Sequence, residues 1–228
     1  MIAIMDYGIG NLASVKNAIE YLGFDVKITS NKEEILSANK VILPGVGAFK
    51  AAIDTFISYG FDEVIYELVK KNTPILGICV GMQLLFEESE EHGIHKGLGL
   101  FKGKFVLFDK EKDGVTYKIP EIGWNQINVK KDNPLLKGLD KKDVYFVHSY
   151  HLDSENEDDV IATTEYAGIT YGSAVRKGNI FACQFHPEKS GEVGLTILKN
   201  FCNLWEYIQL LICMKDKLLD YIRVIIIK

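Results

Sequence analysis

The chain has 228 residues, of which 47% are hydrophobic and 25% are charged, and its formal net charge is −5 at pH 7. This length fits one sizeable α/β domain, or marginally two. The acidic balance argues against a nucleic-acid-binding surface, and Lys and Arg interrupt every apolar run well short of the about 18 residues that a membrane-spanning helix needs.

The first half alternates apolar strands with amphipathic helices. We predict strands over residues 1–5, 25–29, 40–43 and 75–78, and helices over 12–22, 48–59 and 61–72. Strands joined through helices in one sheet run parallel with right-handed crossovers, so this half predicts a mostly parallel central sheet flanked by helices. Gly8 and Gly10 precede the first helix, but a lone G-x-G is weak evidence for a dinucleotide, and no cofactor is expected.

After Gly97 the pattern changes to short strands and turns. We predict strands over residues 98–108, 115–119, 125–129, 144–150, 160–165, 169–176 and 180–185, and a last helix from Ser190 or Gly191 through Asn203. These strands would add antiparallel pairs to the parallel core. The expected fold class is therefore α/β, with a mostly parallel central sheet in the first half and added antiparallel strands in the second.

A loop with two glycines follows the strand predicted at 40–43. Its sequence is Pro44-Gly45-Val46-Gly47. Glycines at the carboxyl end of a strand leave backbone N–H groups free to point at a ligand. The alternative interpretation is an ordinary connection between a strand and a helix.

A Cys between two glycines follows the strand predicted at 75–78. Gly77-Ile78-Cys79-Val80-Gly81 has the G-x-nucleophile-x-G pattern of a nucleophile elbow, with Cys as the nucleophile. A Cβ on either glycine would collide with the sharp turn, and the turn sets Sγ at the start of a helix, where N–H groups favour a thiolate. The alternative is a small buried hydrophobic residue at a strand end.

The thiol needs a basic partner. Lowering its pKa from about 8.5 to about 6 takes roughly 3.4 kcal/mol, whereas a helix dipole supplies about 0.3–1 kcal/mol at an exposed site. His186 ends a predicted strand, and Glu188 follows it with Pro187 fixing the backbone between them. An imidazole oriented by a carboxylate is what a thiol nucleophile requires. His148 and His151 are rival bases, but neither has a carboxylate so tightly set beside it in the sequence.

The other cysteines suggest no further chemistry. The chain contains four cysteines with neither CxxC nor zinc-like spacing, Cys79, Cys183, Cys202 and Cys213. No secretory signal is recognisable at the start. We therefore expect free thiols, no bound metal and a cytoplasmic location.

Together these motifs resemble the class I (triad) glutamine amidotransferases, and among them the glutaminase subunits of imidazole glycerol phosphate synthase. The resemblance covers residues 1 to about 202. The elbow and the His-Pro-Glu run are shared by the whole class. The markers that point to this subunit are Asp6-Tyr7-Gly8, Pro44-Gly45-Val46-Gly47 and Gly123-Trp124-Asn125. The run Phe146-Val147-His148-Ser149-Tyr150 is a further marker of the resemblance.

The resemblance implies roles for individual residues. Cys79 would attack the side-chain amide of glutamine, and His186 and Glu188 would complete the triad. Backbone N–H groups of the oxyanion hole would come from Val46, Gly47 and Val80. Glutamine would be held by Gln83 and by the backbone of Ser149 and Tyr150. The face that docks on the partner would include Asn11 and Trp124.

The resemblance also implies a partner. The ammonia would pass to a (β/α)8-barrel cyclase that makes imidazole glycerol phosphate and AICAR in histidine biosynthesis, the two chains forming a heterodimer. Residues 1–202 would form the amidotransferase domain and residues 203–228 a C-terminal extension of unknown role.

Two departures from the family pattern bear on this expectation. Val80 replaces the usual Leu, which leaves its backbone N–H unchanged. Glu121 replaces a usual His, a charge change near the docking face that leaves a paralogous amidotransferase of amidino-sugar or surface-polysaccharide synthesis open as an alternative. A non-catalytic regulatory subunit and a cysteine peptidase of the same fold are further alternatives, against which the intact triad and Gln83 argue.

Overall fold

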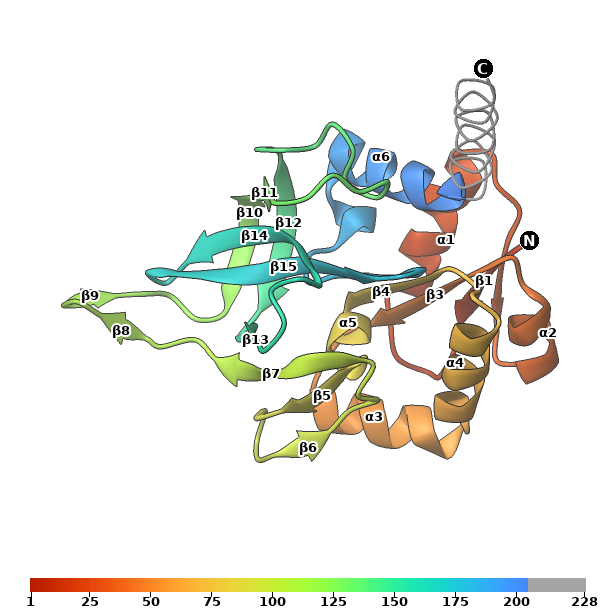
Figure 1. The fold of residues 1–228 in the computed structure, drawn as a ribbon, viewed down its shortest axis with the longest axis horizontal. Helices are drawn as coiled ribbons and strands as arrows, with labels where there is room; N and C mark the ends of the chain where they lie inside the picture. The colour runs from red at the N-terminus through yellow and green to blue at the C-terminus, as the bar shows by residue number, and fades with distance from the viewer. Residues whose placement is uncertain (205–228) are drawn as a thin grey trace, which may run out of the picture.

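An eight-stranded sheet runs through the computed structural model, which describes residues 1–204 (Figure 1). Its order is β11-β14-β15-β16-β4-β3-β1-β2. The parallel part consists of β1 (Ile2–Met5), β2 (Val26–Thr29), β3 (Lys40–Gly45), β4 (Ile75–Cys79) and β16 (Ile180–Cys183). Its strands follow the 2-1-3-4-5 order of flavodoxin-like folds. The antiparallel extension consists of β15 (Ile169–Lys177), β14 (Val160–Tyr166) and β11 (Asn128–Val129). The predicted fold class is confirmed.

Helices cover both faces of the parallel part. On one face lie α1 (Leu12–Tyr21) and α6 (Gly191–Cys202), and on the other lie α2 (Lys32–Ser37), α3 (Phe49–Ser58) and α4 (Phe61–Lys70) (Figure 1). The sequence of α4 shows why it forms. Its buried residues recur at helical spacing, Phe61, Val64, Ile65 and Leu68. Acidic residues stand in its first turn and Lys70 in its last, where they complement the helix dipole. The short α2 was not predicted.

The second half contributes smaller sheets. One contains β5 (Phe86–Ser89), β6 (His95–Lys96), β7 (Phe101–Leu107) and β13 (Tyr150–Ser154). Two-stranded pairs are formed by β10 (Glu121–Gln126) with β12 (Asp143–His148), and by β8 (Glu111–Lys112) with β9 (Val115–Thr116). The strand predicted over residues 144–150 is therefore wrong as a single element. It divides at Ser149 into β12 and β13, which belong to different sheets.

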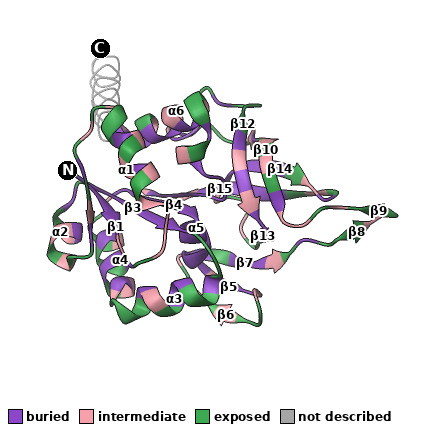
Figure 2. Cartoon of the chain, turned by 180° about the vertical axis from the view of Figure 1, so that it is seen from behind, coloured by how far each residue is buried: buried purple, intermediate pink, exposed green. Residues whose placement is uncertain are grey.

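The buried strands of the main sheet form the core and bring three loops together (Figure 2). Because β3, β4 and β16 are parallel neighbours, their carboxyl ends lie at the same edge of the sheet. Val46, Cys79 and His186 stand at or just after these ends. Ligands of open α/β sheets bind at such an edge.

The predicted C-terminal extension lies almost wholly outside the described residues. Of residues 203–228 the structure describes only Asn203 and Leu204, and Leu204 is buried. The boundary at residue 202 therefore stays a prediction. Within residues 1–204 no helix has the length and apolar character required to cross a membrane.

Candidate active site

Cys79 sits in a strained turn between a strand and a helix. Strand β4 ends at Cys79, and α5 (Val80–Leu84) starts at the next residue. Cys79 has φ +54°, a conformation that is strained for a residue with a side chain. A Cβ on Gly81 would overlap the carbonyl oxygen of Leu43, and one on Gly77 would lie 2.9 Å from the Gly81 carbonyl oxygen. The predicted need for both glycines is confirmed.

His186 and Glu188 form a buried pair on the neighbouring loop. His186 Nδ1 lies 2.9 Å from Glu188 Oε1, and both side chains are almost fully buried. The backbone N–H of His186 donates to the Tyr145 carbonyl at 2.9 Å, and the Ser190 hydroxyl donates to the His186 carbonyl at 2.6 Å. Since a carboxylate only accepts hydrogen bonds, Nδ1 carries a proton. Nε2 is left buried without a hydrogen-bond partner in the described part of the chain.

Electrostatics favour a protonated imidazole beside the sulfur. Burial lowers the pKa of His186, but Cys79 and Glu188 outweigh it and raise that pKa from 6.5 to about 10. Hydrogen bonding and charge at Cys79 both contribute to this rise, as do those at Glu188. Helix α5 has only 5 residues, which makes its dipole a minor contributor. The site therefore favours the protonated form of His186 next to Cys79.

We expect the activity to persist into alkaline solution. With a His186 pKa of about 10, the ring stays protonated through neutral pH. The value of kcat/KM should be flat from about pH 7 to about 9 and fall as the pH passes about 10, because kcat/KM reports ionisations of the free enzyme. Glu188→Gln should move this decline to lower pH. A pH–rate profile of both proteins measures this, and a decline beginning near pH 6.5 in the unmodified protein would contradict it.

The raised pKa also has a consequence for folding. A group whose pKa is higher in the folded state stabilises that state fully below its unfolded pKa. For His186 this contribution is complete below about pH 6.5 and is lost as the pH rises through about 10.

Two further side chains support the Cys and the Glu. Asn11 Nδ2 donates to Glu188 Oε1 at 3.3 Å, so a residue expected at the partner face also contacts the carboxylate. Gln184 Nε2 donates to Cys79 Sγ at 3.5 Å, and Gln83 Nε2 donates to Gln184 Oε1 at 3.1 Å. Gln184 was given no role from the sequence. Its position two residues before a candidate base at a strand end was the available signal, because such residues share one face.

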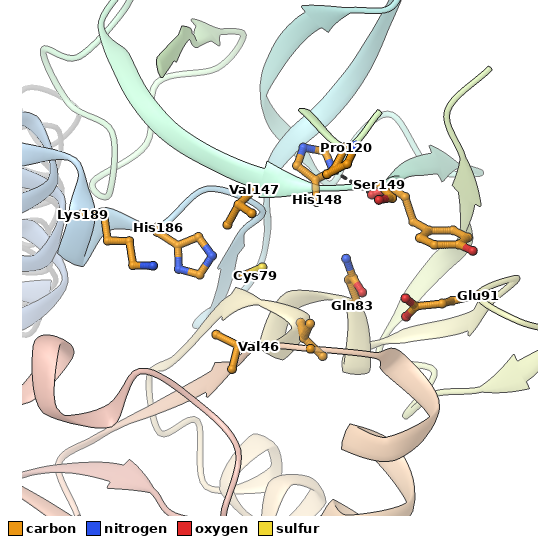
Figure 3. A pocket seen from close by; sticks show the side chains of 13 residues that line it. Val46, Cys79, Gln83, Glu91, Pro120, Val147, His148, Ser149, His186 and Lys189 are labelled. Atoms are coloured by element: carbon orange, nitrogen blue, oxygen red, sulfur yellow. Dashed lines mark hydrogen bonds between the residues drawn. The ribbon is translucent and has the colours of Figure 1, made fainter. Parts of the chain in front are cut away.

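One cavity of about 390 Å³ joins these groups (Figure 3). Its size is that of a small-molecule site. The predicted residues that line it are Val46, Gly47, Cys79, Val80, Gln83, Ser149, Tyr150 and His186. Glu91, Pro120, Val147, His148 and Lys189 also line it, and none of them was predicted to do so. Glu91 is fixed by accepting a hydrogen bond from the Phe49 backbone N–H at the start of α3. Figure 3 shows Glu91 on the far side of Gln83 from Cys79.

The structure corrects two expectations about His148 and Glu121. His148 does have a closely set carboxylate, because Glu121 Oε2 lies 3.2 Å from its Nε2 and both side chains are buried. Figure 3 shows the His148 ring on the side of β12 away from Cys79, which makes it a poor rival to His186. Glu121 points inward with 2% of its surface exposed, so it adds no charge to the surface. Trp124, three residues along the same strand, is 58% exposed.

Comparisons with known proteins place these features in a family. The profile of the family "Glutamine amidotransferase class-I" matches residues 3–204. A protein of Caldanaerobacter subterraneus subsp. tengcongensis named imidazole glycerol phosphate synthase subunit HisH is 52% identical over 202 residues, which cover 88% of this chain and 97% of that protein. The chain belongs to the class-I glutamine amidotransferases. A HisH subunit of Wolinella succinogenes is 47% identical to this amidotransferase over 90% of this chain and 100% of its own length.

Solved structures agree with the fold of this amidotransferase. A crystal structure described as a glutamine amidotransferase has a TM-score of 0.67 at 20% identity, covering 88% of this chain and 98% of its own. The PurLQS structure from Thermotoga maritima has a TM-score of 0.69 at 19% identity, covering 90% and 98%. Within residues 1–204 of the amidotransferase, no cluster of three His, Cys, Asp or Glu side chains is arranged to hold a metal ion.

Proposed function

We propose that this chain is the glutaminase subunit of an imidazole glycerol phosphate synthase in histidine biosynthesis. It hydrolyses glutamine and passes the ammonia to a cyclase subunit, a (β/α)8 barrel, in a cytoplasmic heterodimer. The observation that carries the chemistry is that Cys79 and the unpaired Nε2 of His186 meet in one cavity. The partner is inferred from HisH relatives that match nearly the whole described chain. With Glu121 buried, the observation that favoured a paralogous enzyme no longer applies.

In the first half-reaction a thioester forms and ammonia leaves. The Cys79 thiolate attacks the side-chain carbonyl carbon of glutamine, and the carbonyl electron pair moves onto oxygen. This oxyanion accepts hydrogen bonds from the backbone N–H of Val80 and from one N–H of residues 46–47. As the C–N bond breaks, His186 Nε2 gives its proton to the departing nitrogen. The products are ammonia, a γ-glutamyl thioester and a neutral imidazole.

In the second half-reaction water releases glutamate. The neutral Nε2 of His186 takes a proton from a water molecule while the water oxygen attacks the thioester carbonyl carbon. Taking this proton restores the imidazolium, and collapse of the tetrahedral intermediate then breaks the C–S bond, expels the Cys79 thiolate and leaves glutamate. Glu188 keeps Nδ1 protonated and the ring oriented throughout, the role that the buried carboxylate has in Ser-His-Asp triads.

The cavity suits the length and charge of glutamine. Gln83 lies between the sulfur and the outer wall, where an amide side chain can bind the substrate (Figure 3). We assign Glu91, on the far side, to the α-ammonium group, because a carboxylate pairs with a cation. The backbone of Ser149 and Tyr150, which also lines the cavity, is then assigned to binding the α-carboxylate of glutamine.

The expected result is stoichiometric release of glutamate from L-glutamine by the chain purified with its cyclase. L-Asparagine, shorter by one methylene, should react at least about 10-fold more slowly, since one methylene in a fitted site is worth about 1–3 kcal/mol. Glutamate release is measured together with the identity of the co-purified protein. Release of ammonia without glutamate, or co-purification with a synthetase of another pathway, would contradict the proposal.

A further inference from the structure

A buried polar network adjoins the cavity, and one of its members, His148, is among the residues that line it. Glu121 on β10 and His148 on β12 stand directly opposite in the antiparallel register. Tyr171 on β15 donates its hydroxyl to Glu121 Oε2 at 2.8 Å, and Asn125 Nδ2 donates to Glu121 Oε1 at 2.8 Å. His148 Nε2 lies 3.2 Å from Glu121 Oε2. None of these groups is used by the mechanism above.

The contacts define which atoms donate. His148 Nδ1 lies 2.8 Å from the Tyr150 carbonyl oxygen, which only accepts, so Nδ1 carries a proton. Burial, and then Glu121, raise the pKa of Tyr171 well above 10, so its hydroxyl keeps its proton and donates to the carboxylate. Nε2 of His148 lies 3.1 Å from the Tyr171 hydroxyl and 3.2 Å from Glu121 Oε2, so Tyr171 and Glu121 together face this nitrogen. The ring is therefore held at both nitrogens, by the Tyr150 carbonyl on one side and by Tyr171 and Glu121 on the other.

The network ends at backbone that lines the cavity. Ser149 separates β12 from β13, and its carbonyl accepts from the Phe108 backbone N–H at 3.0 Å. The Tyr150 carbonyl is held by His148. Both residues line the cavity. The Phe108 ring packs against the His148 ring with centroids 5.3 Å apart, which further fixes its orientation.

We propose that Glu121 is a positioning residue for glutamine binding. It holds the His148 ring so that Nδ1–H fixes the Tyr150 carbonyl, which presets the 149–150 backbone for the substrate. This proposal rests on the proposed function, because it concerns the same substrate. It assigns Glu121 to substrate affinity, while the reacting groups Cys79 and His186 are left unaffected.

The test separates affinity from chemistry. Glu121→Leu should raise the KM for glutamine of the complex with the cyclase at least about 10-fold, because the buried Tyr171 hydroxyl loses its acceptor and the His148 ring loses the carboxylate beside it. The value of kcat should change less than about 3-fold. Glu121→Gln retains an acceptor oxygen and should restore much of the affinity. The rate at which iodoacetamide alkylates Cys79 should equal that of the unmodified protein in both variants.

A matched control removes a buried hydrogen bond elsewhere. Thr164 donates to Ser173 at 2.9 Å between β14 and β15, and neither residue lines the cavity. Thr164→Val should lower the melting temperature without changing KM. If Glu121→Leu does not fold, the same measurements are made on Tyr171→Phe, which removes one hydrogen bond to Glu121.

Calorimetry makes the result independent of turnover. The Kd of L-glutamine is measured in the complex carrying Cys79→Ala, with and without Glu121→Leu, and a weakening of at least about 10-fold is expected. Unchanged Kd and KM, or a KM change equal to that of Thr164→Val, would overturn the role of Glu121. Absence of glutamate release by the unmodified complex would instead overturn the proposed function.

Discussion

Replacing Cys79 with Ala should abolish glutamine hydrolysis while leaving ammonia-dependent synthesis by the complex intact. Without the thiolate no thioester forms, and losses on removing a nucleophile reach about 10⁴-fold or more. The acceptor chemistry lies on the cyclase in the proposed heterodimer, so ammonium salts should support product formation at the unmodified rate. Glutamate release and product formation from each nitrogen source are measured on the same preparation.

Cys202→Ala is the matched control. Cys202 is also buried, in α6, and burial raises the pKa of its thiol to about 12, so it is not a nucleophile at neutral pH. This variant should retain glutamine-dependent activity. Glutamine-dependent synthesis that survives in Cys79→Ala, or is lost in Cys202→Ala, would contradict the assignment of Cys79.

The second large effect is stimulation by the partner. The chain alone should be a poor glutaminase, and the cyclase loaded with acceptor substrate should stimulate it at least about 10²-fold, the contribution of one oxyanion donor. The structure indicates where the loop can turn. A Cβ on Gly45 would lie 2.6 Å from the Gly81 backbone nitrogen, so Gly45 is tightly packed, whereas Gly47 has φ +85° and open space around it. The segment between Gly45 and Gly47 can therefore reorient about Gly47, and the backbone N–H of Val46 moves with it.

Two substitutions at one position test this interpretation. Val46→Pro removes an N–H and fixes φ, and should reduce the stimulation more than it weakens partner binding. Val46→Ala keeps the N–H and should be stimulated like the unmodified protein. Steady-state glutamate production is measured for the chain alone, with cyclase, and with cyclase and an acceptor analogue. Equal rates under the three conditions would show that this loop is not a switch.

The chemistry-bearing motifs were predictable because each is local. The elbow is a run of five residues, and His186 and Glu188 are two residues apart. The contact that requires Gly77 lies within the turn, whereas Gly81 is required by Leu43 on the neighbouring strand. The parallel core was predictable because its strands are short apolar runs bounded by Gly, Pro or polar residues. The helix α2 was missed, although Asn31 accepts a hydrogen bond from the Glu34 backbone N–H, a capping pattern that was visible in the sequence.

What escaped prediction depends on contacts between distant segments. Nothing in the apolar run from 144 to 150 marks the division at Ser149, which arises because β12 pairs with β10 while β13 pairs with β7. Glu121 and His148 are separated by 27 positions, and only the antiparallel register makes them neighbours. The position of Glu91 in the cavity likewise depends on how its loop packs on α3.

Strand β10 constrains how this protein can change during evolution. Glu121 faces the cavity wall, while Ile122 and Trp124 are exposed on the other face, where we expect the partner. Substitutions on one face can accumulate without disturbing the other, since side chains of a strand alternate. A one-residue insertion or deletion would exchange the faces and place Glu121 in solvent. If the partner face and the role of Glu121 are as proposed, recombination that replaces residues 121–126 would transfer partner choice and glutamine affinity together.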